Sequence, residues 1–272
     1  MVLFFMILAA VIFLLLLLLL AILGRREHPG VEALRGHCYA HRGLHGNGSP
    51  ENSLDAFQRA KAKGYGVELD VHLTKDGQLV VIHDSTLDRV TGESGIVEDL
   101  YLSQLENFQL EKTQERIPTL EQVLELFEGK VPIILELKSY RGNYKKLTEK
   151  ACKLMDTYGG IFCMESFDPR CLMWLRKHRP DIIRGQLSEN YFTPGRPKMP
   201  GILRFILTHH LENFLTRPDF VAYRFSERHC TPSNKLFLKR YLAVAWTLTN
   251  QEDYTQAVSE GWLPIFEGFQ PL

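Results

Sequence analysis

The chain lacks the features that mark several large classes of protein. Its 32 basic and 32 acidic residues cancel, and no dense run of Lys and Arg occurs, which excludes a basic nucleic-acid-binding protein. Its five cysteines are odd in number and form no C-x-x-C pair, which argues against a disulfide framework and against a zinc cluster. An apolar content of 45% excludes a disordered chain. We therefore expect no nucleic-acid partner, and scattered thiols in a reducing compartment.

Three common catalytic motifs are also missing. The sequence has no H-E-x-x-H motif, which argues against a zinc peptidase. It has no G-x-S-x-G motif and no Walker loop either, which argues against a serine hydrolase and a P-loop nucleotidase. Any catalytic chemistry must therefore come from other groups.

Charge is missing from one end of the chain. Residues 1–24 contain no Asp, Glu, Lys or Arg, and residues 2–23 form an unbroken apolar run. As a helix this run is about 33 Å long, enough to cross a ~30 Å hydrocarbon core. A cleaved signal peptide is the alternative, but it normally has a basic start and a shorter apolar stretch of about 7–15 residues. We expect a single-pass membrane anchor over 1–24, with contact to the membrane through residues 2–23.

Two arginines and a short linker follow the apolar run. Arg25 and Arg26 come directly after it, and the positive-inside rule then puts the rest of the chain on the cytoplasmic side. Residues 25–36 are a linker containing two glycines. The remaining residues, 37–272, are expected to form one domain, since α/β barrels reach about 250 residues as a single unit.

Short apolar runs rich in β-branched residues alternate with amphipathic ones along 37–272. This rhythm predicts a parallel sheet covered by helices, and with eight parallel strands it predicts a TIM (β/α)8 barrel, an α/β fold. The expected strands are 38–42, 66–73, 79–83, 131–138, 161–166, 182–186, 220–224, 242–248 and 263–266. The expected helices include 53–63, 119–127, 144–158, 169–178, 233–241 and 251–260.

Nine strands are one too many for such a barrel, and a hairpin explains the surplus. Asp76-Gly77 lies between two apolar runs, which is a strong hairpin signal. A two-residue turn there would pair Lys75 with Gln78 and place Asp70 opposite His83. The strand at 79–83 would then run antiparallel to its neighbour and leave eight parallel strands.

Two stretches do not follow the rhythm of strands and helices. Residues 84–117 are long for a connection, and we expect them to form a small insertion after the His83-Asp84 motif. Residues 192–218 contain four prolines around a partly apolar helical core at 202–207. That core is either ordinary barrel packing or part of an apolar groove.

Four clusters of charged residues stand at the carboxyl ends of expected strands. In parallel barrels this end of the strands forms the active-site face. Alternation along a strand puts Glu68 and Asp70 on one side, and likewise Glu136 and Lys138. The clusters are His41-Arg42-Gly43, Glu68-Leu69-Asp70, His83-Asp84 and Glu136-Leu137-Lys138.

These clusters predict metal-assisted chemistry on a phosphate ester. Glu68, Asp70 and Glu136 would form a site of hard oxygen ligands suited to Mg²⁺ or Ca²⁺. His41 and His83 could act as acid and base near neutral pH. Arg42 offers a planar fork and Lys138 a point charge for a phosphate.

Ordered motifs along the chain resemble the glycerophosphodiester phosphodiesterase family. They are His41-Arg42-Gly43, Pro50-Glu51-Asn52-Ser53, Ala56-Phe57, Glu68-Leu69-Asp70-Val71, Thr74-Lys75-Asp76-Gly77, Val80-Val81-Ile82-His83-Asp84, Pro118-Thr119-Leu120-Glu121, Glu136-Leu137-Lys138, Ser166-Phe167 and Trp246-Thr247. The resemblance runs from about residue 37 to the end, and its first half is the stronger.

The resemblance implies a TIM barrel and a set of roles. It implies a divalent metal held by Glu68, Asp70 and Glu136, with His41 and His83 as the acid/base pair. His83 is also a metal ligand in some descriptions of the family, and both roles stay open. Arg42 would bind the phosphate, and we assign Lys138 and Trp246 to substrate binding as well. The family often ends on a Thr-Asp-x-Pro-like segment where this chain has Phe266-Glu267-Gly268-Phe269, so Glu267 could replace that aspartate.

The expected function is metal-dependent hydrolysis of a glycerophosphodiester to a glycerol phosphate and an alcohol. The membrane anchor and the apolar stretch at 202–207 leave a lysophospholipid open as an alternative substrate, as in a lysophospholipase D. Phospholipase C-like or phospholipase D-like cleavage of another phosphodiester is a second possibility. A non-catalytic membrane-anchored barrel is a third. The sequence leaves the oligomeric state undetermined.

Overall fold

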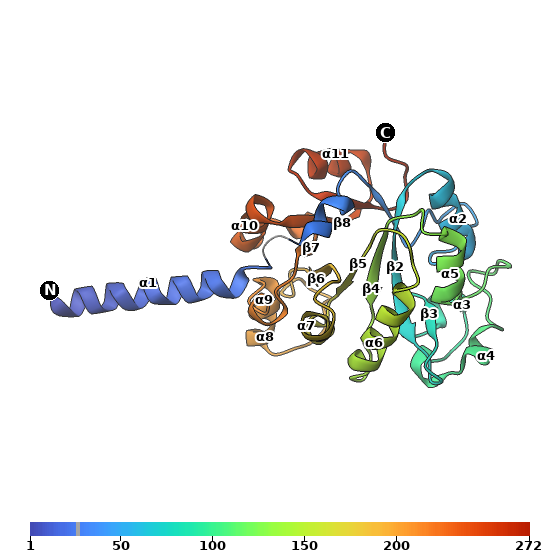
Figure 1. The fold of residues 1–272 in the computed structure, drawn as a ribbon, viewed down its shortest axis with the longest axis horizontal. Coiled ribbons are helices and arrows are strands. Elements are labelled where there is room, and N and C mark those ends of the chain that lie inside the picture. Colours follow the sequence, from blue (N-terminus) through green and yellow to red (C-terminus); the bar gives the residue numbers. More distant parts are fainter. Residues whose placement is uncertain (26–27) are drawn as a thin grey trace.

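The chain folds around a closed barrel of eight parallel strands, seen in a computed structural model that describes residues 1–25 and 28–272 (Figure 1). The ring closes because β1 pairs with both β2 and β9. The barrel strands are β1 (Tyr39–His41), β2 (Gly66–Leu73), β4 (Ile133–Leu137), β5 (Phe162–Ser166), β6 (Arg184–Ser188), β7 (Phe220–Arg224), β8 (Leu242–Leu248) and β9 (Leu263–Phe266). The TIM barrel expected from the sequence is confirmed.

Helices follow the strands and cover the outside of the barrel (Figure 1). They are α2 (Leu54–Ala62), α5 (Leu120–Phe127), α6 (Tyr144–Met155), α7 (Pro169–His178), α8 (Gly201–Thr208), α9 (Asn213–Thr216), α10 (Pro232–Arg240) and α11 (Gln251–Ser259). Side-chain caps start three of them where the sequence indicates. Ser53 accepts a hydrogen bond from the backbone of Ala56, Thr119 forms a capping box with Gln122, and Asp168 caps α7 ahead of Pro169.

Side chains along each barrel strand point alternately outward and inward, and the two faces have different packing partners. The outward face of the barrel packs under the helices and includes Val67 and Leu69 of β2. The inward face holds a second apolar cluster that includes Tyr39 and Ile134. Further along β2 and β4 the inward positions become charged, at Glu68 and Glu136. Apolar residues therefore fill one end of the barrel, and ionisable residues occupy the carboxyl end.

β3 (Leu79–Val81) pairs antiparallel with β2, as expected, but in a different register. Val71 pairs with Val81, and the backbone N–H of Ile82 donates to the carbonyl of Asp70. The expected pairing of Asp70 with His83 is therefore wrong by one residue. The turn has three residues instead of two, and its last residue, Gly77, has a left-handed backbone with φ of 80°.

Side chains of the turn explain this longer loop. The hydroxyl of Thr74 donates to Asp76 Oδ1 and accepts from the backbone N–H of Gln78, at 2.6 and 2.8 Å. The N–H of Lys75 donates to Leu100 O, in the segment that follows β3, so Lys75 takes no part in pairing with Gln78. A contact distant in sequence thus shifts the register.

Residues between β3 and α5 form a small layer with its own apolar cluster. It contains α3 (Asp88–Thr91), a 3-10 turn at Val97–Asp99 and α4 (Leu102–Leu105). Leu87, Val90 and Leu105 pack there against Val80 of β3. The expected insertion at 84–117 corresponds to this layer, which lies on the far side of the barrel from the N-terminus (Figure 1).

The first helix, α1 (Val2–Ile22), projects away from the barrel (Figure 1). It is long and apolar enough to cross a membrane, and none of its most apolar 18-residue stretch is buried against the rest of the protein. The linker expected at 25–36 contains a 3-10 helix, Pro29–Leu34, which packs its Leu34 into the inward-facing cluster of the barrel. Arg26 lies outside the described residues.

Candidate active site

Three carboxylates meet at the carboxyl ends of two neighbouring strands. Glu68 and Asp70 come from β2, and Glu136 comes from β4, where it pairs opposite Asp70. One oxygen atom from each lies within 4.8 Å of the others, and all three side chains are buried. Hard oxygen ligands at this spacing suit a divalent cation such as Mg²⁺ or Ca²⁺.

Charge crowding in this cluster supports the same conclusion. Burial raises the pKa of Glu68, and the charges of Asp70 and Glu136 raise it further. Burial also raises the pKa of Glu136, against the opposing effect of Lys138. At Asp70 burial acts in the same direction, but Lys138, His83 and Arg42 outweigh it and hold the pKa below its usual range. Buried carboxylates that repel one another fit a bound cation, which would offset the repulsion.

Lys138 and Asn52 hold the carboxylates in position. Lys138 Nζ lies 2.8 Å from Glu136 Oε1 and 3.1 Å from Asp70 Oδ1. Burial by itself lowers the pKa of Lys138, but these two carboxylates outweigh it and raise the pKa above its usual value. The side-chain amide of Asn52 donates to Asp70 Oδ2 at 2.9 Å. Both oxygens of Asp70 are thus oriented by neighbouring side chains.

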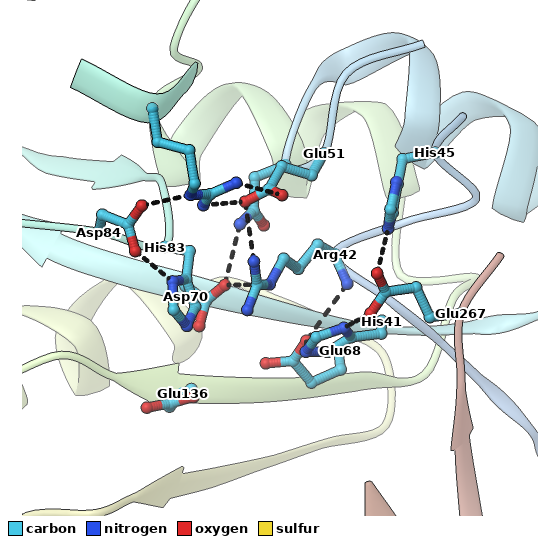
Figure 2. A network of polar contacts seen from close by, with 12 residues as sticks. His41, Arg42, His45, Glu51, Glu68, Asp70, His83, Asp84, Glu136 and Glu267 are labelled. Carbon is cyan, nitrogen blue, oxygen red and sulfur yellow. Dashed lines mark hydrogen bonds and ion pairs between the residues drawn. The ribbon is translucent and has the colours of Figure 1, made fainter. Parts of the chain in front are cut away.

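His41 is held by a carboxylate from the last segment of the chain. Its Nδ1 lies 2.5 Å from Glu267 Oε2, and its Nε2 lies 3.8 Å from Glu68 Oε2 (Figure 2). Burial lowers the pKa of His41 although Glu267 favours the charged ring. The hydrogen bond to His41 lowers the pKa of Glu267 to about 2. A carboxylate on Nδ1 orients the ring and directs Nε2 toward the carboxylate cluster.

A chain of polar contacts joins His83 to Arg42 across the site. His83 Nδ1 lies 2.7 Å from Asp84 Oδ1, and Asp84 Oδ2 accepts from Arg89 Nε at 2.6 Å. Arg89 also pairs with Glu51, at 2.7 Å, and Glu51 in turn accepts from Arg42 Nη1 at 2.9 Å (Figure 2). These contacts orient both His83 and Arg42.

Arg42 is also constrained through its backbone. It adopts a left-handed φ of 55°, which is uncommon for a residue other than glycine. The backbone N–H donates to the carbonyl of Glu68 at 2.9 Å, and the guanidinium Nε lies 3.5 Å from Asp70 Oδ2. This turn at the end of β1 directs the guanidinium toward the carboxylates.

Two members of the cluster, Glu68 and Glu136, line a cavity of about 790 Å³ at this end of the barrel. Its lining contains polar groups, which we call the polar wall, and aromatic and aliphatic side chains, which we call the apolar wall. Trp246 packs edge-on against Phe167, with ring centroids 5.6 Å apart, and the Arg224 guanidinium lies 4.4 Å from the Trp246 ring centre. The apolar wall includes Phe167, Leu187, Tyr191, Met199, Leu207, Trp246 and Ile265.

The structure brings the residues singled out from the sequence to one place. His41, Arg42, Glu68, His83, Glu136, Lys138 and Trp246 all line this cavity. Asp70 does not line it but belongs to the carboxylate cluster. Their chemical roles remain predictions.

Several further groups of the site were not expected from the sequence. Arg89 was not expected, because it lies in the 84–117 segment and meets Glu51 only through the fold. Glu165 also lines the cavity, beside Glu136 on the next strand. Its position at the end of an expected strand, just before Ser166-Phe167, was a usable signal. Glu189 and Arg224 complete the polar wall and form an ion pair at 2.9 Å.

Comparisons with known proteins agree with this geometry. A model of the glycerophosphoryl diester phosphodiesterase family matches residues 41–217. A glycerophosphodiester phosphodiesterase from Caldanaerobacter subterraneus subsp. tengcongensis is 40% identical over 160 residues, which cover 55% of this chain and 65% of that protein. A lysophospholipase D from Rattus norvegicus is 39% identical over 132 residues, which cover 44% of this chain and 40% of that protein. The chain thus spans less than two thirds of the length of either relative.

A solved structure is similar along most of the chain. A phosphodiesterase from Oleispira antarctica, in complex with the product sn-glycerol-3-phosphate, superposes with a TM-score of 0.71. The similarity covers 87% of this chain and 94% of that one, at 23% sequence identity, and so supports the barrel fold. The family model covers more than half of the chain and contains every predicted site residue except Trp246. The chain belongs to the glycerophosphoryl diester phosphodiesterase family.

Proposed function

We propose that this protein is a membrane-anchored, metal-dependent hydrolase that splits glycerophosphodiesters into a glycerol phosphate and an alcohol. One observation carries the proposal. Two histidines, His41 and His83, line the same cavity as the carboxylates Glu68 and Glu136. Family membership and the fold shared with the Oleispira antarctica phosphodiesterase support the same reaction.

The substrate phosphate would bind between the carboxylate cluster and the positively charged side chains of Arg42 and Lys138. Glu68, Asp70 and Glu136 would hold the divalent metal, which supplies positive charge to the phosphate oxygens when bound. Arg42, fixed by Glu51, offers a planar fork to a phosphate oxygen pair. Lys138 orients Glu136 and Asp70 and adds a further positive charge. Trp246 would pack against the organic part of the substrate.

His41 and His83 would move the protons. One takes a proton from the attacking hydroxyl, and the other donates a proton to the leaving alcohol. Burial favours the neutral form of His41, and Glu267 stabilises the imidazolium that forms when the ring gains a proton. Both features suit the role of base for His41, which leaves the role of acid to His83, oriented by Asp84.

The reaction can be tested by product analysis with the full-length chain in detergent micelles. Glycerophosphocholine and glycerophosphoethanolamine, with Mg²⁺ or Ca²⁺, should yield glycerol phosphate and the free alcohol by phosphorus NMR. The Asp70→Asn variant should give no product, whereas Glu125→Gln on the exposed face of α5 should match the parent. Release of phosphocholine with free glycerol would indicate phospholipase C-like cleavage. No turnover with any metal would favour a non-catalytic barrel.

A lysophospholipid is the second candidate substrate, and the apolar wall of the cavity favours it. Met199 and Leu207 line that wall, and the relative from Rattus norvegicus is a lysophospholipase D. If an acyl chain lies there, each buried methylene contributes about 0.8 kcal/mol, so KM should fall as the chain lengthens. Met199→Asp should abolish this trend and spare the turnover of glycerophosphocholine. A KM that does not change with chain length would leave the free glycerophosphodiester as the substrate.

We also propose that α1 is an uncleaved anchor with the barrel on the cytoplasmic side. Contacts between the end of α1 and the barrel support the anchor. Arg217 Nη1 donates to the carbonyls of Leu20 and Leu23, and Asn213 donates to that of Ile22. A signal sequence removed after export would lose these contacts.

The two arginines after α1 support the cytoplasmic side, although Arg25 also pairs with Asp219 at 2.6 Å. The exposed thiol of Cys230 gives a test of sidedness in intact cells. A membrane-impermeant maleimide should label Cys230 only after the cells are opened. Labelling in sealed cells would reverse the proposed orientation.

A further inference from the structure

We propose that a second part of the protein, the α8–α9 face, rests on a bilayer surface that contains anionic lipid, beside the point where α1 enters the membrane. We define the α8–α9 face by five apolar side chains: Ile202, Leu203, Phe205, Phe214 and Leu215. The proposal rests on the membrane anchor proposed above and adds a docking surface on the barrel domain itself.

The α8–α9 face is apolar and exposed. Ile202 is 69% exposed, and the other four residues are each at least 40% exposed. The opposite side of α8 buries Leu207 and Thr208 against the barrel. Part of α8 is therefore used for packing, and the rest carries apolar side chains outward. Several exposed large apolar side chains on two successive helices indicate a contact surface.

Hydrogen bonds place the α8–α9 face next to the end of α1. Asn213, the first residue of α9, donates to Ile22 O at 3.0 Å. Arg217, just after α9, donates to Leu20 O and Leu23 O at 3.0 and 2.9 Å. A Cβ atom at Gly24 would lie 2.4 Å from Pro218 O, so the chain passes close against the barrel there. Figure 1 shows α8 and α9 at the side of the barrel from which α1 projects.

The position of the α8–α9 face beside the end of α1 indicates that a bilayer covers it. If α1 crosses a bilayer, its last turn lies at the membrane surface, and the hydrogen bonds hold α9 at the same level. An amphipathic surface helix buries its apolar side about 5–10 Å into the headgroup boundary. The exposed side chains of α8 and α9 are then where such contacts form, and they continue the apolar surface of α1.

The charge of the surrounding segment complements an anionic surface. Residues 192–217 contain four basic residues, Arg196, Lys198, Arg204 and Arg217. Arg196 pairs with Glu189 and Glu227, so the other three supply the positive charge that faces a membrane. The only acidic residue in the segment 192–217 is Glu212, which is buried with 4% exposure. The whole chain is neutral, so this positive charge is a local feature. Basic residues beside a membrane helix attract anionic lipid headgroups.

The α8–α9 face also borders the proposed active site. Pro197 and Met199, just before α8, and Leu207, near its end, line the catalytic cavity. A lipid surface against α8 would bring the rim of that cavity to the headgroup layer. The docking surface would thus favour substrates that reside in the bilayer over substrates dissolved in water.

Depth-dependent quenching of a fluorescent label tests the proposal with the full-length chain in nanodiscs. Cys230→Ser gives a parent background without the exposed thiol. Phe205→Cys in that background carries an environment-sensitive label, and doxyl-labelled phosphatidylcholine is the quencher. Tyr101→Cys, at the residue just before α4, is the matched control, because Tyr101 is 47% exposed against 46% for Phe205. In Figure 1, α4 lies on the side of the barrel away from α1.

The lipid should quench the Phe205 label several-fold more than the Tyr101 label, and added phosphatidylglycerol should increase the difference. Lys198→Glu should remove the effect of phosphatidylglycerol. Equal quenching at the two positions, or free access of aqueous iodide to the Phe205 label, would overturn the proposal. Protection from both quenchers that grows with protein concentration would show that a second copy covers the face, and would also overturn it.

A label at Leu14 in α1 separates failure of the docking surface from failure of the anchor. Quenching at Leu14 without quenching at Phe205 would leave the anchor and remove the docking surface. No quenching at Leu14 would remove both.

As a second variant, Phe205→Glu with Phe214→Glu should cut turnover of a lysophospholipid held in the bilayer at least several-fold. Turnover of soluble glycerophosphocholine should stay unchanged, which shows that the variant is folded. Equal loss on both substrates would contradict docking.

Discussion

His41 Nδ1 lies 2.5 Å from Glu267 Oε2, so the first strand of the barrel and the segment after its last strand meet at one imidazole. β1 and β9 are neighbours in the ring, and this pairing brings the two residues together. We infer from this contact that Glu267 positions the His41 ring.

The Glu267→Gln variant should lower kcat by about 10–100-fold, with little change in KM. The amide can still contact His41 but does not stabilise the imidazolium, and the expected range is below that of direct acid/base groups. Glu267→Asp should restore part of the activity at the same KM, because it keeps the charge. A purely structural role predicts instead a fall in melting temperature for Glu267→Gln and no rescue by Asp.

The carboxylate cluster gives a second prediction. Glu68→Ala and Asp70→Ala should each abolish turnover and weaken metal binding, while far-UV circular dichroism stays that of the parent. The reason is that each removes one of three oxygen ligands within 4.8 Å of one another. Calorimetric titration with Mg²⁺ and Ca²⁺ measures the affinity. Undiminished metal binding by a variant lacking all three carboxylates would refute the site.

The histidines give a third prediction. His41→Ala and His83→Ala should each lower kcat/KM by roughly 10²–10⁴-fold, the usual range for acid/base groups. A substrate with a strongly acidic leaving group needs no protonation, so it should rescue only the variant that lacks the acid, expected to be His83→Ala. Rescue of His41→Ala alone would exchange the two roles. If neither variant alters the bell-shaped pH profile of the parent, the acid/base assignment is wrong.

Glu212 gives a prediction about stability and pH. Both oxygens of this buried carboxyl lack a hydrogen-bond partner among the described residues, and burial raises its pKa to about 8. Because the folded pKa exceeds the ordinary value of 4.5, the folded state holds this proton more tightly than the unfolded state does. The stability gained in this way is complete below about pH 4.5 and is lost as the pH rises through 8. The loss is about 1.4 kcal/mol for each unit of pKa difference.

The melting temperature of the parent, measured between pH 5 and pH 9, should therefore decline more steeply than that of Glu212→Gln. The amide cannot ionise, and the substitution changes the shape of the side chain little. Glu125→Gln, at an exposed position on α5, is the control and should follow the parent. Parallel curves for parent and Glu212→Gln would show that Glu212 is ionised in the fold.

The barrel and most of its site were predictable from the sequence because they depend on local patterns. Alternation along β2 and β4 puts Glu68, Asp70 and Glu136 on the inner face, and Lys138 directly follows β4. The parallel arrangement then brings these strand ends together. Seven predicted residues line the cavity, and each lies in or just after a strand that a local pattern predicts.

What the sequence did not reveal depends on contacts between distant segments. The hairpin register was missed because Leu100 binds the backbone of Lys75 and because Thr74 and Asp76 bind each other. The pair of Arg89 with Glu51 joins the layer after β3 to the loop before α2, and no local pattern indicates it. The placement of α9 against the end of α1 is of the same kind.

Restoration of activity to the metal-stripped, full-length protein tests the central claim most directly. The chelator-treated chain in micelles should release no glycerol phosphate from glycerophosphocholine. Titration with Mg²⁺ or Ca²⁺ should restore turnover in step with the binding of metal, and Asp70→Asn should show neither. Full turnover by the metal-free protein, or metal binding that restores no turnover in any substrate tested, would contradict the account.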